Sequence, residues 1–183
     1  NYKLKKEGGL IPNAEPKDIV CRYERINTNV FESENDGATY VADKIVAAIK
    51  AKEEKDETFV LGLTTGHSPL GIYAKLVDKF RAGEVSFRNV VVFSLDEFYG
   101  ISKEDRQSRN FRIHEEFLEY VNVKPENVYI PDSTISLNAI SQYCRDYEAK
   151  IAQMGGIDLM LLGVGPKGQV GFNEPGSYSN TKT

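Results

Sequence analysis

Three short, almost wholly apolar runs alternate along this chain with segments of helical periodicity. The runs are TFVLGL (58–63), NVVVFSL (89–95) and IDLMLLGVG (157–165). Such runs are typical of parallel strands that are covered on both faces. Parallel strands need crossover connections, which are usually helical. The sequence therefore predicts an α/β fold with a three-layer, doubly wound, mostly parallel sheet and helices on both faces.

Helical patterns occupy four segments, one before the first run and three between the runs. The segments are 36–54, 68–80, 108–121 and 139–154. The first places Val41, Ile45, Val46 and Ile49 on one face, and the last does the same with Ile140, Tyr143, Tyr147 and Ile151. Ser68 is the expected N-cap of the second helix, with Pro69 at its first position. Two further strands are expected at 25–31, as an edge strand, and at 127–131, so the fold is of the Rossmann-like type.

Length and composition indicate one domain. The 183 residues carry 23 Lys and Arg against 27 Asp and Glu, a net charge of −4, with no basic run that would indicate nucleic-acid binding. No apolar stretch reaches the roughly 20 residues that span a bilayer. Cys21 and Cys144 are too few for a disulfide framework, which favours a reducing cytoplasm. We expect an N-terminal extension over 1–21 and a single α/β domain over 22–183 that is truncated at its C-terminal end.

Polar motifs follow each of the three apolar runs. They are TTGHS after Leu63, DEFYG after Leu95 and GPKGQ after Val164. In parallel sheets ligands bind beyond the carboxyl ends of the strands. We therefore expect the three motifs to open on one edge of the sheet.

The first motif, within LTTGHSPLG (63–71), is a turn between a strand and a helix. The backbone N–H groups and the positive end of a helix can bind phosphate or carboxylate. Thr65, Gly66, His67 and Ser68 are the candidate phosphate-binding residues. The alternative is a tight turn with a helix cap and no ligand.

The second motif places two adjacent carboxylates, Asp96 and Glu97, directly after a strand. In an extended segment they point to opposite sides, so only one can face a given ligand. A carboxylate shielded from water binds protons more tightly and can act as a general base. The alternative is that Asp96 caps the following turn and Glu97 pairs with an arginine.

The third motif, GPKGQVGFNEPGS (165–177), combines glycines with a polar FNEP element. Gly163, Gly165 and Gly168 allow close backbone approach to a ligand. Asn173 and Glu174 precede the rigid Pro175, and Glu174 could orient an acid–base partner. The alternative is a surface loop.

Taken together, FVLGLTTGHSPLGIY, VVFSLDEFYG, GIDLMLLGVG and GFNEPGS make the chain resemble the glucosamine-6-phosphate deaminase (isomerase) family, which shares a fold with 6-phosphogluconolactonases. The resemblance runs from about residue 34 to the end. It implies conversion of glucosamine 6-phosphate and water to fructose 6-phosphate and ammonia, without a metal or other cofactor. It implies a small amino-sugar phosphate as partner, no nucleic acid and no membrane, and it leaves a homo-oligomer open.

The resemblance also implies roles for single residues. Asp96 matches the carboxylate that transfers the proton, residues 65–68 match the phosphate loop, and Glu174 matches the carboxylate that supports a ring-opening histidine. The family's ring-opening pair is an Asp two residues before a His, and here Lys167 and Gln169 take those positions. Glutamine does not exchange protons at useful pH, and lysine does so only when burial lowers its pKa.

Three functions therefore stay open. The first is a deaminase or isomerase that uses Asp96. The second is a sugar-phosphate-binding or regulatory module without catalysis. The third is a lactonase-type hydrolase, which needs a histidine to activate water where Gln169 stands. His114, in a predicted helix, is expected to be packed or solvated.

Overall fold

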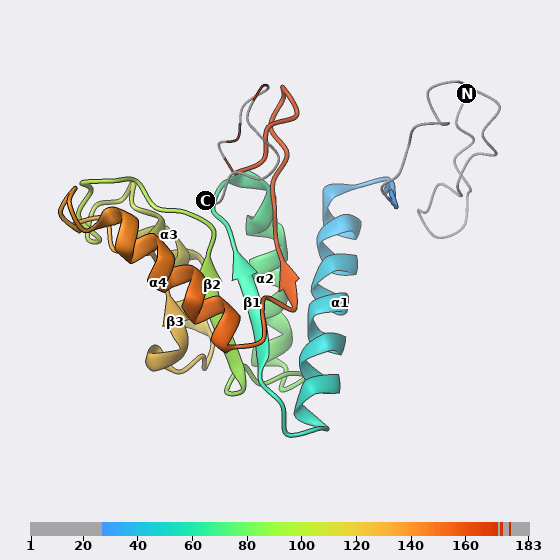
Figure 1. Cartoon of the computed structure of the whole chain (residues 1–183). Helices are drawn as coiled ribbons and strands as arrows, with labels where there is room; N and C mark the ends of the chain where they lie inside the picture. The colour runs from blue at the N-terminus through green and yellow to red at the C-terminus, as the bar shows by residue number, and fades with distance from the viewer. Residues whose placement is uncertain (1–26, 172, 174–175, 177–183) are drawn as a thin grey trace.

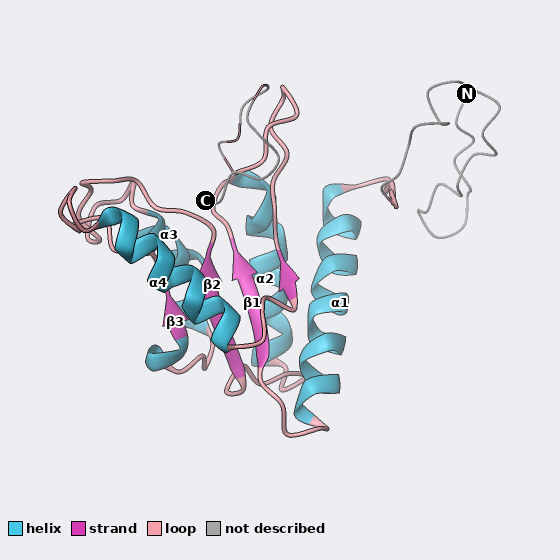
Figure 2. Ribbon diagram, viewed as in Figure 1, coloured by secondary structure: helices cyan, strands magenta, loops and turns pink. Residues whose placement is uncertain are grey.

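The sheet has four parallel strands. The computed structural model describes residues 27–171, 173 and 176. The strands are β1 (Phe59–Leu63), β2 (Val90–Ser94), β3 (Val128–Tyr129) and β4 (Leu159–Met160). Their order is β3-β2-β1-β4, and Figure 2 shows them side by side with their carboxyl ends pointing the same way. The chain moves outward from β1 to β3 and then crosses to the other side of β1, so the order reverses between β1 and β4.

Helices cover both faces of the sheet, as predicted. Helices α1 (Glu34–Glu53) and α2 (His67–Arg81) pack against each other, with α3 (Arg109–Glu116) next to α2. Helix α4 (Ile140–Gln153) crosses the opposite face, in front of β2 and β3 in Figure 1. Two short 3₁₀ helices, η2 (Leu118–Tyr120) and η3 (Pro125–Asn127), lead into β3.

The larger core lies between the sheet and the layer of α1, α2 and α3. Alternate side chains of β1 and β2 enter it, among them Phe59 and Val92, and Ile45 and Tyr73 meet them from the helices. A smaller cluster on the other face joins Val60, Val91 and Phe93 to Tyr147 and Ile151 of α4. The residues of β1 and β2 are buried on both faces, which explains their unbroken apolar sequence.

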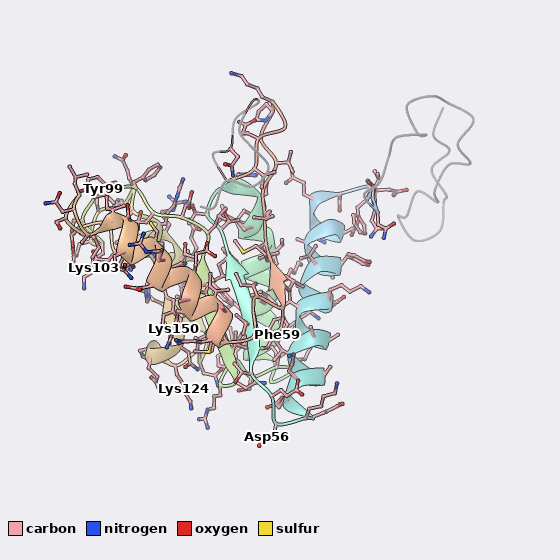
Figure 3. The ribbon with its side chains drawn as sticks, in the orientation of Figure 1. Asp56, Phe59, Tyr99, Lys103, Lys124 and Lys150 are labelled. Atoms are coloured by element: carbon pink, nitrogen blue, oxygen red, sulfur yellow. The ribbon has the colours of Figure 1, made fainter. Side chains whose placement is uncertain are left out.

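Labelled side chains in Figure 3 mark the two ends of the sheet. Figure 3 shows Asp56 and Lys124 near the amino ends of β1 and β3, and Tyr99 and Lys103 on the loop that follows β2. On the face that α4 covers, the ammonium group of Lys150 lies 5.3 Å from the ring centre of Tyr129. Within the described ranges no helix is both long and apolar enough to cross a bilayer.

The helix boundaries lie within two residues of the prediction except at the end of α3, and the predicted cap of α2 was wrong. Helix α2 begins at His67 with Gly66 as its N-cap, so Ser68 is not the cap and Pro69 is the third helical residue. The predicted helix 108–121 ends at Glu116, because Phe117 leaves the helical region with φ −147° and is fully buried.

The strand predictions were too long. Residues 27–31 form no strand, whereas residues 25 and 26 of that prediction lie outside the described part. Strand β3 ends before Pro131, which has no N–H to continue a ladder. Strand β4 has two half-buried residues, and Val164 beyond it is 73% exposed. In the described residues β4 pairs with a single neighbouring strand, β1.

Candidate active site

A small polar pocket of about 230 Å³ lies beyond the carboxyl ends of β1, β2 and β4. It opens where the strand order reverses, which is the place where doubly wound sheets bind ligands. The pocket is lined by Thr64, Thr65, Leu95, Asp96, Arg109, Gly163, Gly165, Gln169 and Gly171. The three sequence motifs therefore meet at one edge of the sheet, as expected.

Two tyrosines, one buried and one half-buried, hold the backbone around this edge. The Tyr73 hydroxyl of α2 donates to the carbonyl oxygen of Thr64, directly after β1. The Tyr147 hydroxyl of α4 lies 2.8 Å from the carbonyl oxygen of Ser94 and 3.0 Å from that of Tyr129. The ends of β1 and β2 are thus each hydrogen-bonded to a helix that packs on the sheet.

Asp96 is the carboxylate that lines the pocket. Its side chain is 24% exposed, and its Oδ1 lies 3.4 Å from Nε of Arg109, the first residue of α3. Burial raises the pKa of Asp96 above its ordinary value; the neighbouring Glu97 acts in the same direction, and the Arg109 charge opposes both. A partly shielded carboxylate with raised proton affinity is suited to general-base chemistry.

Glu97 turns away from the pocket and holds the start of α3. Its Oε1 accepts from the backbone N–H groups of Phe98 at 2.8 Å and Arg109 at 2.9 Å. Its Oε2 accepts from the Ser108 hydroxyl at 2.7 Å and from the Asn110 N–H at 2.9 Å. The alternative interpretation assigned a cap to Asp96 and an arginine partner to Glu97. The structure shows the opposite, because Asp96 pairs with an arginine and Glu97 caps a helix.

The loop after β4 closes on itself through Gln169. The Gly165 N–H donates to the Gln169 carbonyl oxygen at 2.8 Å, and the Lys167 N–H donates to Gln169 Oε1 at 3.0 Å. A Cβ atom on Gly165 would lie 2.3 Å from Gln169 Cδ, so only glycine leaves room for this side chain. Gln169 therefore shapes the pocket wall.

Other predicted residues of this loop lie outside the pocket lining. Lys167 and Gly168 are exposed, and the burial that a catalytic lysine needs is missing at Lys167. Asn173 is exposed and donates its backbone N–H to the carbonyl oxygen of Val170. Glu174 lies outside the described residues. Gly163 lines the pocket together with Gly165.

The TTGHS turn contributes to the pocket through its first half. Thr65 lines the pocket, whereas His67 and Ser68 line a separate groove between α1 and α2. The first turn of α2 contains no acidic residue, so its positive end is not neutralised locally. Backbone N–H groups, more than the His67 and Ser68 side chains, are what this turn presents for an anion.

Gly66 adopts φ 123° and ψ −173°, a conformation open essentially to glycine alone. A Cβ atom there would meet no heavy atom within 4 Å, so substitution strains only the backbone. We expect Gly66→Ala to lower the free energy of unfolding by about 1 to 3 kcal/mol, measured by denaturant titration. Gly83→Ala, at φ 74° and equally uncrowded, is the control, with a cost of about 1 kcal/mol. Equal costs would contradict the assignment of special strain to Gly66.

Arg109 is the charged residue among the pocket residues that the sequence motifs did not predict; the others are Thr64, Leu95 and Gly171. Its guanidinium carbon lies 4.4 Å from the ring centre of Phe98. A signal was present in SRNF (108–111), which places an arginine at the start of a predicted helix, directly after the loop that carries Asp96. Periodicity alone does not show that the loop folds back to bring the two side chains together.

Two further features border the site. A larger, mostly apolar hollow of about 690 Å³ lies between α4 and the ends of β2 and β4, and it shares Leu95, Asp96 and Gly171 with the pocket. No cluster of three or more His, Cys, Asp or Glu side chains that could hold a metal ion occurs among the described residues. His114 is half-buried in α3, and Cys144 is exposed on α4.

A carboxylate in a pocket at the switch point of a doubly wound sheet defines an α/β domain built to bind or convert a small ligand. The family model described as glucosamine-6-phosphate isomerases/6-phosphogluconolactonase matches residues 32–171. The chain belongs to this family. The resemblance seen in the sequence motifs is therefore confirmed.

Individual relatives agree with this assignment. The glucosamine-6-phosphate isomerase of Candida albicans is 44% identical over 154 residues, which cover 84% of this chain and 60% of that protein. A putative glucosamine-6-phosphate deaminase-like protein of Bacteroides thetaiotaomicron is 39% identical over 171 residues, 93% of this chain and 26% of its own length. A solved monomeric glucosamine-6-phosphate deaminase superposes with a TM-score of 0.76 at 31% identity, over 82% of this chain and 60% of the other. The chain thus spans three fifths or less of these relatives.

Proposed function

We propose that this protein converts glucosamine 6-phosphate and water to fructose 6-phosphate and ammonia. The observation that carries the proposal is the half-buried Asp96 in one pocket with Thr65 and the loop after β4. The relatives named above are glucosamine-6-phosphate deaminases or isomerases by name. The proposal takes its substrate class, a sugar phosphate, from the names of these relatives.

In this proposal Asp96 takes the proton from carbon 2 of the open-chain sugar and returns it to carbon 1. The oxygen at carbon 1 gains a proton and the amine nitrogen loses one, so carbon 1 becomes a CH₂OH group and carbon 2 becomes an imine. Water then replaces the imine nitrogen, which leaves as ammonia, so the atoms balance. Backbone N–H groups at the start of α2 are suited to hold the phosphate of the substrate.

A second candidate function is sugar-phosphate binding without catalysis. It is favoured by the pocket lining, in which the ionisable side chains among the described residues are Asp96 and Arg109. Gln169 offers hydrogen bonds and no proton transfer at useful pH, so ring opening has no evident acid–base group in this loop. The same residue argues against a lactonase-type hydrolase, which needs a base there to activate water.

The test is ammonia release from glucosamine 6-phosphate by the full-length protein that carries this chain. Thermal unfolding with the same sugar phosphate, and with unphosphorylated glucosamine as control, is measured in parallel. Turnover supports the deaminase. Thermal stabilisation by the phosphorylated sugar without turnover favours the binding module. If neither occurs while 6-phosphogluconolactone is hydrolysed, the lactonase replaces both.

Lys167 is the remaining candidate for a substitute acid in the ring-opening loop. Because its side chain is exposed, we expect Lys167→Ala to change kcat by no more than about twofold, as for most surface substitutions. The measurement is steady-state ammonia release from glucosamine 6-phosphate. A loss of about a hundredfold, in the range of general acid–base help, would instead assign proton transfer to Lys167.

A further inference from the structure

Arg109 is held in place by three separate contacts. Its backbone N–H donates to Glu97 Oε1 at 2.9 Å, its guanidinium lies over the Phe98 ring, and its Nε lies 3.4 Å from Asp96 Oδ1. The arginine and aspartate side chains are 19% and 24% exposed. The same loop therefore supplies the ring beneath the guanidinium, the acceptor for its backbone and the carboxylate beside it.

This arrangement sets opposing influences on the pKa of Asp96. Burial and the adjacent Glu97 both raise the pKa of Asp96, and Arg109 is the charge that lowers it. The polar side chains that line the pocket after the ends of β1 and β4 are those of Thr64, Thr65 and Gln169, which carry no charge at ordinary pH. Among the described residues, Arg109 and Glu97 are the charged groups that act on the pKa of Asp96, in opposite directions. Glu148 of α4 also lines the hollow that borders Asp96.

The contact also limits the direction of the carboxylate. Asp96 follows the end of β2 in a loop without regular structure, so its side chain has no neighbouring ladder to orient it. The stacked, backbone-anchored guanidinium places a positive charge on one side of Oδ1. Asp96 and Arg109 both line the pocket.

We propose that Arg109 is a positioning residue for proton transfer, which holds Asp96 ionised and aimed into the pocket. The inference rests on the proposed function, since it assigns a partner to the base of that reaction. It differs from a purely structural role, in which Arg109 only ties α3 to the loop through Phe98 and Glu97. An uncharged residue of similar size separates the two roles.

The experiment compares Arg109→Gln and Arg109→Lys with the natural protein at full length. We expect the acid side of the kcat/KM profile to move to higher pH in Arg109→Gln. The loss should be roughly tenfold near the midpoint of that limb and much smaller at alkaline pH, where Asp96 is ionised without help. Arg109→Lys keeps the charge and should fall between the two. Arg106→Gln removes an exposed arginine from the preceding loop and serves as the matched control.

A second readout does not depend on turnover. The ¹³C carboxyl resonance of Asp96, assigned by its loss in Asp96→Asn, is titrated by NMR without sugar. We expect its midpoint to rise in Arg109→Gln and to stay in Arg106→Gln. An unmoved midpoint, with activity lowered equally at all pH values, would overturn the proposal and leave Arg109 a structural role. A raised midpoint in a protein that releases no ammonia would uphold the pairing and reject the deaminase function.

Discussion

Asp96→Asn is expected to reduce kcat for ammonia release from glucosamine 6-phosphate by about 10² to 10⁴, the range for loss of a general base. Asparagine has nearly the same shape and can still accept from Arg109, but it does not take up a proton. Stability should change little, because the partly exposed pair with Arg109 contributes at most about 1 kcal/mol. The measurements are steady-state kinetics and thermal unfolding.

The control is Asp105→Asn, an exposed residue of the loop between β2 and α3. Its Oδ1 accepts from the Gln107 N–H, a contact that an asparagine oxygen can also make. We expect this variant to keep full activity. If Asp96→Asn retained more than about a fifth of the natural kcat, the loss would fall far below that of a general base, and the base of the reaction would have to be another group.

Glu97→Ala has the second large expected effect, and it acts on stability. The substitution leaves four donors without their acceptor: three backbone N–H groups and the Ser108 hydroxyl. Hydrogen bonds to a charged group contribute about 1.5 to 3 kcal/mol, and loss of a helix cap about 1 kcal/mol. Water reaches part of this site after truncation, so we expect a loss of about 2 to 3 kcal/mol in the free energy of unfolding.

The same residue gives a pH dependence with a defined sign. Burial opposes ionisation of Glu97, but its hydrogen bonds outweigh burial and lower its pKa below the ordinary value. The folded pKa is thus below the unfolded pKa of about 4.3. Its stabilising contribution is complete above the unfolded pKa and is lost as pH falls through the folded pKa. This acid-dependent part of the unfolding free energy should be missing in Glu97→Ala.

Denaturant titrations at a series of pH values measure both effects. Glu115→Ala, an exposed glutamate of the same helix, is the matched control and should cost less than about 0.5 kcal/mol. Glu97→Gln should fall in between, since one amide oxygen can accept while the NH₂ group faces donors. If Glu97→Ala and Glu115→Ala were equally stable, the capping role of Glu97 would be wrong.

Much of the fold could be predicted because its signals are local. The apolar runs of β1 and β2, and the spacing of Ile45, Val46 and Ile49 on α1, depend only on which faces of a strand or helix are buried. Strand ends followed by polar motifs then had to meet at one edge, and Thr65, Asp96 and Gly163 do so. The edge of the sheet that carries the candidate pocket could be predicted from the sequence for this reason.

The predictions were wrong where burial or cap geometry sets the end of a strand or helix. Strand β4 and the end of α3 were predicted too long, because an apolar sequence does not reveal whether both faces are covered or where a residue such as Phe117 turns inward. Gly66 in place of Ser68 as the cap of α2 depends on a backbone conformation that only glycine adopts. Such boundaries follow from single dihedral angles and not from periodicity.

The sequence by itself determined the fold class, the family and the edge of the sheet at which the site lies, since periodicity and strand-end motifs are properties of neighbouring residues. Only the tertiary structure decided how Asp96 and Glu97 divide their roles, and that Arg109 joins the site. The reason is that charge and hydrogen-bond partners depend on how the irregular loop between β2 and α3 folds back. That path brings residues 96, 97 and 109 into contact across twelve residues of chain that carry no periodic signal.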